Sequence, residues 1–161
     1  MQSNTREIID GWNSWMQSHL VETGYFSDIA ISTLVQTKQN EVNAHGAISS
    51  PPFFTSLVQT PNFLINNDQI NIISTFFYDP TPAYKNGITI GKTSFIPIMI
   101  TDNFIYARKD MPGTGHNTKL CLFCTKSTSF IIIAISTMAN KAAKIYSYLT
   151  RINNFLIENG L

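Results

Sequence analysis

Two neighbouring segments, Asp68-Gln-Ile-Asn-Ile-Ile-Ser-Thr-Phe76 and Gly87-Ile-Thr-Ile-Gly-Lys-Thr-Ser-Phe95, differ in the spacing of their apolar residues. In the first, isoleucine and phenylalanine recur three and four positions apart, which predicts a helix over residues 66–76. Asn67 and Asp68 are the candidate caps of this helix, because short polar side chains bond to free backbone amides. In the second segment apolar and polar residues alternate, which predicts a run of strands.

On the C-terminal side of these segments the pattern continues as strands and closes with a helix. Asp79-Pro-Thr-Pro82 ends the first helix, since proline has no amide donor and restricts the residue before it. Leu120–Cys124 and Phe130–Ile135 predict a further pair of strands. The last helix is predicted over Asn140–Asn159, with Gly160 as its stop.

On the N-terminal side, apolar side chains at helical spacing predict a helix over Thr5–Val21. Asp28–Val35 is rich in β-branched residues and predicts a strand, which we expect to form a hairpin with Val42–His45. Gly46–Pro61 contains three prolines and shows little periodicity, so a surface loop is predicted there. This order of elements predicts a single α+β domain with an antiparallel sheet.

Length and composition restrict the class of protein. A chain of 161 residues fits one domain, and 43% hydrophobic residues exclude a disordered chain. The net charge of +1 creates no strong field for nucleic acid, so none is expected as a partner. The polar N-terminus has no apolar core of a signal peptide, and the longest apolar run, Phe130–Ile135, is too short to span a bilayer. The cytosol is therefore expected.

Three stretches together resemble the profilin family. The first is Gly11-Trp-Asn-Ser-Trp-Met16 followed by Asp28-Ile-Ala-Ile31, similar to the N-terminal helix and first strand of profilins. The second combines the Asp68–Phe76 helix with Gly87–Phe95, where profilins have Gly-Leu-x-Leu-Gly and a strand that starts with Lys-Tyr. The third, Thr150–Leu161, is similar to the C-terminal helix of plant-type profilins, including the final Gly-Leu. Their order and spacing carry the resemblance, because each alone is mostly a packing pattern.

The resemblance implies a particular fold and a non-enzymatic role. The fold is a central antiparallel sheet, with the N- and C-terminal helices packed together on one face and a further helix on the other. Residues 1–10 become a polar N-terminal extension, and 11–161 a single domain with an inserted loop at about 46–61. A monomeric protein of the cytoplasm and cytoskeleton is implied, one that binds actin monomers and regulates their polymerisation.

The resemblance also implies a site for proline-rich partners such as formins. A polyproline II helix is stiff and poor in internal hydrogen bonds, so it docks on flat aromatic faces at low entropic cost. Trp12, Trp15 and Phe155 match the family positions in the two terminal helices. Asn43 falls where the family has a strand tryptophan, and Leu161 replaces a frequent terminal tyrosine. The alternative is that both tryptophans are core residues, since a spacing of three places them on one helix face in either case.

For actin, the resemblance implies a basic surface. The matching positions are Arg108, Lys109, Lys126, Lys141 and Lys144. A basic cluster suits an acidic actin monomer and steers the encounter, although isolated surface lysines are usually no more than solvated charges. The same patch would attract phosphoinositide headgroups, as a secondary ligand.

The residues do not suggest catalysis, a cofactor or a metal site. Cys121 and Cys124 have the spacing of a CxxC motif, but they lie in a predicted strand and too few further ligands accompany them. Buried structural cysteines are therefore expected. An alternative to the actin role remains: a profilin-like regulatory module that binds another protein or a small molecule. Convergence of the basic residues on one face would distinguish the two.

Overall fold

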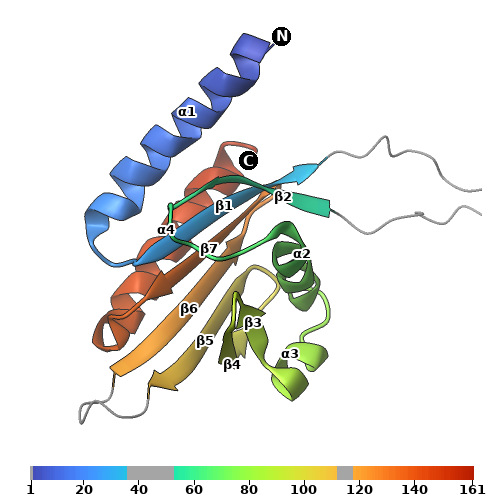
Figure 1. Ribbon diagram of the computed structural model, residues 1–161, viewed down its shortest axis with the longest axis vertical. Coiled ribbons are helices and arrows are strands. Elements are labelled where there is room, and N and C mark those ends of the chain that lie inside the picture. The colour runs from blue at the N-terminus through green and yellow to red at the C-terminus, as the bar shows by residue number, and fades with distance from the viewer. Residues whose placement is uncertain (1, 36–52, 112–117) are drawn as a thin grey trace, which may run out of the picture.

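The computed structural model describes residues 2–35, 53–111 and 118–161, which fold around one antiparallel sheet (Figure 1). Its strands are β1 (Asp28–Val35), β2 (Phe53–Gln59), β3 (Ile88–Ile90), β4 (Thr93–Ile100), β5 (Phe104–Met111), β6 (Thr118–Lys126) and β7 (Phe130–Ser136). The seven strands lie in the order β2-β1-β7-β6-β5-β4-β3. The N-terminal strand β1 therefore pairs with the C-terminal strand β7 inside the sheet, where all of β7 is buried.

The two faces of the sheet carry separate hydrophobic cores. Alternate side chains of a strand point to opposite faces, so in β6 Phe123 belongs to one core and Leu122 to the other. Helices α1 (Gln2–His19) and α4 (Ala142–Glu158) cover the first face. Helices α2 (Asn67–Phe76) and α3 (Thr81–Asn86) cover the second (Figure 1). We call these the α1/α4 face and the α2/α3 face. The arrangement confirms the predicted fold class.

Helix α1 begins earlier than the sequence predicted, at Gln2 rather than Thr5. Most of the polar extension is thus helical, and its first turns reach beyond the sheet (Figure 1). A short 3-10 turn, η1 (Val21–Thr23), follows the helix, and Gly24 then adopts a positive φ of 72°. The C-terminal helix α4 lies close to its predicted bounds, after the 3-10 turn η2 (Ala139–Lys141).

Helix α2 starts with a cap one residue earlier than predicted. The Asn66 side chain accepts a hydrogen bond from the Gln69 amide at 2.9 Å, and the Gln69 side chain accepts one from the Asn66 amide. This reciprocal pair is a capping box. The prolines after α2 do end it, but Pro82 also lies in the first turn of α3, where a missing amide hydrogen is harmless. The sequence analysis missed this short helix.

The prediction of a loop over Gly46–Pro61 was wrong for Phe53–Gln59, which forms the strand β2. The strand pairs with β1, and a bulge shifts the register between Ile31 and Ser32. Because of the bulge, Phe54 faces the α2/α3 core whereas Val58 faces the α1/α4 core. The alternation that would have revealed a strand is lost there. The predicted strand Val42–His45 lies outside the described residues. None of the helices within the described ranges is long and apolar enough to cross a membrane.

Candidate functional site

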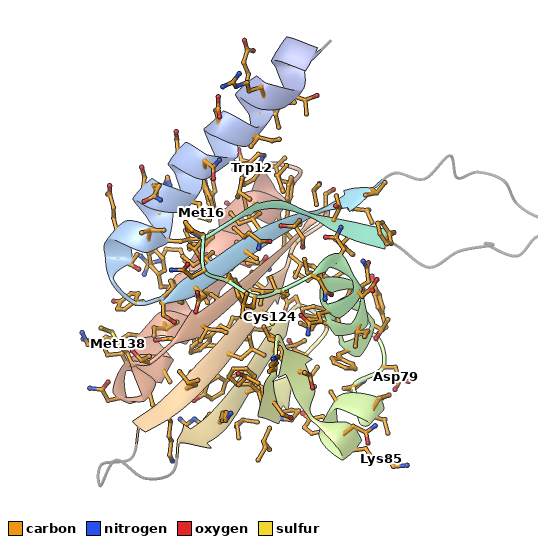
Figure 2. All side chains as sticks on the ribbon, viewed as in Figure 1. Trp12, Met16, Asp79, Lys85, Cys124 and Met138 are labelled. Atoms are coloured by element: carbon orange, nitrogen blue, oxygen red, sulfur yellow. The ribbon has the colours of Figure 1, made fainter. Side chains whose placement is uncertain are left out.

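The aromatic residues of α1 lie along its contact with the domain. Met16 and Leu20 are fully buried, whereas Trp12 and Trp15 are half-buried at the rim of the same core. Figure 2 labels Trp12 and Met16 on α1. The Trp12 ring lies 4.6 Å from that of Phe130 and 5.5 Å from that of Trp15, between ring centroids. Each tryptophan packs on the core and also keeps an accessible surface.

His19 extends this aromatic row by one turn. Its ring stacks on Trp15, with centroids 4.9 Å apart and an interplanar angle of 16°. Its Nδ1 lies 3.1 Å from the Trp15 carbonyl oxygen, and the Tyr148 hydroxyl donates to the His19 carbonyl oxygen. The sequence analysis missed this residue, although its position four residues after Trp15 places it on the same helix face.

A groove lies between this row and the C-terminal part of α4. It has a volume of about 510 Å³. We call it the aromatic groove, and it is lined by Ile8, Gly11, Trp12, Trp15, His19, Phe155, Leu156, Asn159 and Leu161. Phe155 is 51% exposed on the α4 side. The structure therefore brings together Trp12, Trp15 and Phe155, which the sequence analysis had placed in one site.

The aromatic groove is apolar and accessible. Among the residues that the structure describes, no Lys, Arg, Asp or Glu side chain lines it. A charged ligand would lose its hydration on binding here and would find, among the described lining residues, no side chain of opposite charge to compensate. The aromatic groove therefore favours an uncharged ligand. Asn43, at the position of the family's strand tryptophan, lies outside the described residues.

Arg108 lies on the α1/α4 face of β5. Its Nε donates to the Tyr106 hydroxyl, and its guanidinium carbon is 5.2 Å from the centre of the Tyr106 ring. Tyr106 in turn stacks on Phe123, with ring centroids 5.1 Å apart. Burial raises the pKa of Tyr106, and the Arg108 cation opposes this effect. The guanidinium is thus held in place by a packed aromatic residue.

Lys109 and Lys126 lie on the other side of the sheet. Lys109 pairs with Leu120, which packs against the α2/α3 core. Lys126 follows Cys124 by two positions and shares its face, and its Nζ lies 5.1 Å from the centre of the Tyr78 ring, just after α2. The structure does not bring these two lysines together with Arg108.

Lys141 and Lys144 lie at the start of α4 and are exposed. Lys144 also borders a shallow depression that contains Arg151, which is two turns further along the helix. The other lining residues are Tyr25, Ala143, Ser147 and Tyr148. Within the described ranges, three of the five predicted actin-site residues therefore belong to the α1/α4 face, namely Arg108, Lys141 and Lys144.

The part of the α1/α4 face next to Arg108 also carries exposed apolar side chains. Ile96 on β4 pairs with Arg108 and is 68% exposed. Tyr146 on α4 is 40% exposed and contacts Phe104 at 4.6 Å between ring centroids. The sequence analysis did not single out Ile96, and only its place in the sheet shows it as an accessible neighbour of the arginine.

The two cysteines are buried, as predicted. Cys121 belongs to the α1/α4 core and Cys124 to the α2/α3 core, because a spacing of three in a strand places side chains on opposite faces. Burial raises the pKa of the Cys124 thiol. Over the described part of the chain no three His, Cys, Asp or Glu side chains gather as a metal site would require.

Comparisons with known proteins agree with this geometry. The family model described as Profilin matches residues 10–161. Profilin IA of Acanthamoeba castellanii superimposes with a TM-score of 0.70 at 14% identity, over 93% of this chain and 99% of that one. Rat profilin 2a gives 0.68 at 13% identity, over 95% and 99%.

A third similar structure contains a ligand. Mouse profilin IIa in complex with a double repeat from the FH1 domain of mDia1 gives a TM-score of 0.64 at 13% identity, over 94% of this chain and 99% of that one. A sequence search of curated proteins gave no match. Since the family model spans nearly the whole chain and the solved structures share its fold, this chain belongs to the profilin family.

Proposed function

We propose that this chain binds monomeric actin and proline-rich segments, and that it regulates actin polymerisation in the cytoplasm and cytoskeleton without catalysing a reaction. The observation that carries the proposal is the aromatic groove, where Trp12, Trp15 and Phe155 meet without a charged side chain among the described lining residues. Membership of the profilin family supports both partners.

Proline-rich segments suit the aromatic groove for a physical reason. A polyproline II helix offers flat pyrrolidine faces and pays little conformational entropy on binding, so stacking on aromatic rings gives a net gain. The complex of mouse profilin IIa with a double repeat from the FH1 domain of mDia1 supports this proposal. Formins and similar proteins are the proposed partners.

For actin, we propose the surface formed by Arg108, Lys141 and Lys144, with Ile96 as its apolar neighbour. An apolar centre with a polar rim is the usual anatomy of a protein interface, and here the rim is basic. Lys144 and Phe155 are 11 residues apart on α4, about 16 Å along the helix. This separation supports binding of both partners at once, so that a tethered actin monomer is delivered to a filament.

Calorimetric titration of the purified chain with monomeric actin tests the proposal. Micromolar or tighter binding is expected, and a variant with Arg108→Glu and Lys144→Glu should lose at least tenfold in affinity. The matched control carries Lys109→Glu and Lys126→Glu, with the same change in net charge on the opposite face, and should bind nearly as the unmodified chain does. An equal loss of actin affinity in both variants would contradict the assignment of the actin site to this face. If the unmodified chain did not bind actin at all, the actin role itself would be contradicted.

A second candidate function is a profilin-like module that binds another protein or a small molecule and has no actin role. It is favoured by the division of the five predicted basic residues between two faces. If the chain did not bind actin but still bound an oligoproline peptide, the module without an actin role would replace the actin-binding role as the proposed function.

Phosphoinositide headgroups are proposed as a secondary ligand of the depression that contains Lys144 and Arg151. Two cations seven positions apart on α4 lie on one side of the helix and would share a phosphorylated headgroup. Vesicles with phosphatidylinositol bisphosphate should retain the chain in a sedimentation assay, and the variant with Lys144→Glu and Arg151→Glu should stay in solution. Equal sedimentation of both proteins would refute the assignment.

A further inference from the structure

The N-terminal turns of α1 add Ile8 to the aromatic groove, and this residue lies upstream of the profilin family match. The match to the profilin family begins at residue 10, whereas α1 begins at Gln2, about two helical turns earlier. Within these turns Ile8 lines the aromatic groove and is 55% exposed, and Ile9 packs against the α1/α4 core. Ile9 therefore holds this part of the helix on the domain, so Ile8 is fixed in position before any ligand arrives.

Gly11 lies next to Ile8 in the groove, and the fold does not require a glycine there. It does not adopt a positive φ, and a Cβ built on it would meet no atom within 4 Å. A glycine inside a helix costs about 1 kcal/mol relative to alanine. Its missing side chain instead leaves the backbone open to close approach from the groove.

We propose that Ile8 and Gly11 form an additional subsite that binds an uncharged apolar residue flanking the proline run of a bound peptide. The inference rests on the proposed binding of proline-rich segments in the same groove. The occupant is uncharged because, in the described part of the chain, the groove offers no charged side chain to pair with a charge. It is apolar because the exposed surface of Ile8 gains free energy only when apolar surface covers it.

The dimensions of the helix give the extent of the subsite. Ile8 precedes Trp12 by four residues, a rise of about 6 Å along α1. A polyproline II segment advances about 3.1 Å per residue, so the subsite corresponds to about two further residues of peptide. Flanking sequence, and not only the prolines, thus contributes to the choice of partner.

Calorimetry with two synthetic peptides tests the subsite: an oligoproline peptide, and the same peptide extended at both ends by leucines. The unmodified chain should bind the extended peptide about fivefold more tightly, since one aliphatic side chain becomes partly buried. Ile8→Ser should bind the two peptides with equal affinity, so that the preference for the extended peptide is lost. Ile72→Ser is the matched control, because Ile72 has the same 55% exposure but lies on α2 outside the groove.

Gly11→Ala is a second variant, and it tests the subsite without removing any side chain that packs on the domain. The added methyl group should fill the open position and abolish the preference for the extended peptide, while the helix becomes more stable and the thermal midpoint rises by about 2 °C. Equal binding of both peptides to the unmodified chain would overturn the subsite and leave the proposed function intact. Failure of the unmodified chain to bind either peptide would overturn both. A preference retained in full by Ile8→Ser would also overturn the subsite.

Discussion

The two faces of the sheet attach their helices in different ways. On the α2/α3 face, α2 holds the edge strand β2 through asparagine side chains. The Asn71 side chain accepts from the Phe54 amide at 2.7 Å and donates to the Phe54 carbonyl oxygen at 2.8 Å. The Asn67 side chain accepts from the Ser56 amide at 3.0 Å. The Asn71 carboxamide thus takes the place of a peptide group of a neighbouring strand.

The spacing explains why two asparagines four apart on a helix match this strand. Four helical residues rise about 6 Å, and two strand residues rise about 6.6 Å. On the α1/α4 face the contact is aromatic instead, and in its described part a groove remains open between the helices. A contact reinforced by hydrogen bonds favours a closed structure, whereas half-buried rings leave a surface for a ligand.

The largest expected effect concerns the aromatic contact. Trp15→Ala should weaken binding of an oligoproline peptide by roughly 30-fold or more, since a central tryptophan in an interface usually contributes at least 2 kcal/mol. Calorimetry measures the loss, and circular dichroism confirms that the variant is folded. Tyr78→Ala, an aromatic that is 65% exposed beyond α2, should leave the affinity unchanged. Equal affinities of the Trp15 variant and the unmodified chain would show that the groove is not the site.

The hydrogen-bonded contact is tested by Asn71→Ala. The substitution leaves the Phe54 amide and carbonyl without their partner, so unfolding free energy should fall by about 2 kcal/mol. Urea denaturation measures this change. Light scattering should also detect self-association, because unpaired groups on an edge strand attract another strand. Asn154→Ala, at an exposed position of α4, is the control and should change stability by less than about 0.5 kcal/mol. A loss no larger than that of the control would contradict the role of Asn71.

Cys124 makes the α2/α3 core sensitive to alkaline pH. Burial raises the pKa of this thiol in the folded state, so the folded chain prefers the neutral form. The associated stability is complete below the unfolded pKa of about 8.5 and is lost as the pH rises above it, by up to about 1.4 kcal/mol per pH unit. Urea denaturation at pH 7 and pH 10 should show a smaller decrease for Cys124→Ala than for the unmodified chain. Equal decreases would mean that other groups cause the effect.

The smallest effect concerns single hydroxyl groups. The Thr125 hydroxyl is buried and, in the described part of the chain, has no hydrogen-bond partner. Thr125→Val keeps the shape and removes this group, so stability should rise by about 1 kcal/mol. Ser74 is the counterpart on the α2/α3 face, where its hydroxyl donates to the Asn71 carbonyl oxygen at 2.6 Å. Ser74→Ala should therefore reduce stability by about 1 kcal/mol, and thermal denaturation of both variants would reveal whether the signs differ.

Hydrophobic periodicity predicted most of the fold, because the helices and the long strands each bury one regular set of side chains. The failures have local causes. At β2 the bulge interrupts the alternation, so Phe54 and Val58 do not show the pattern of a strand. At α3 a proline that ends one helix also begins the next.

The site was predicted in part. Trp12 and Trp15 could be assigned to one helix face, and Ile8 falls within the predicted helix Thr5–Val21. That Ile8 lines the groove, however, depends on where α4 lies beside α1, which the sequence did not indicate. The alternation of side chains along a strand could have assigned the basic residues to separate faces of the sheet. Adjacent positions such as Arg108 and Lys109 must point to opposite faces once β5 is recognised. Whether Arg108 or Lys109 lies on the side of the sheet that α4 covers is a tertiary property, which the sequence does not show.

The pairing of β1 with β7 has a consequence for how the chain is made. Asp28 pairs with Ile135, about a hundred residues later, so β1 has to wait for this partner until β7 has been synthesised. Contacts this distant in sequence slow folding and leave apolar strands exposed in the meantime. A nascent chain that ends before Phe130 lacks the strand that both cores share. We therefore expect the sheet to close only after β7 has emerged from the ribosome, with a dependence on chaperones before that.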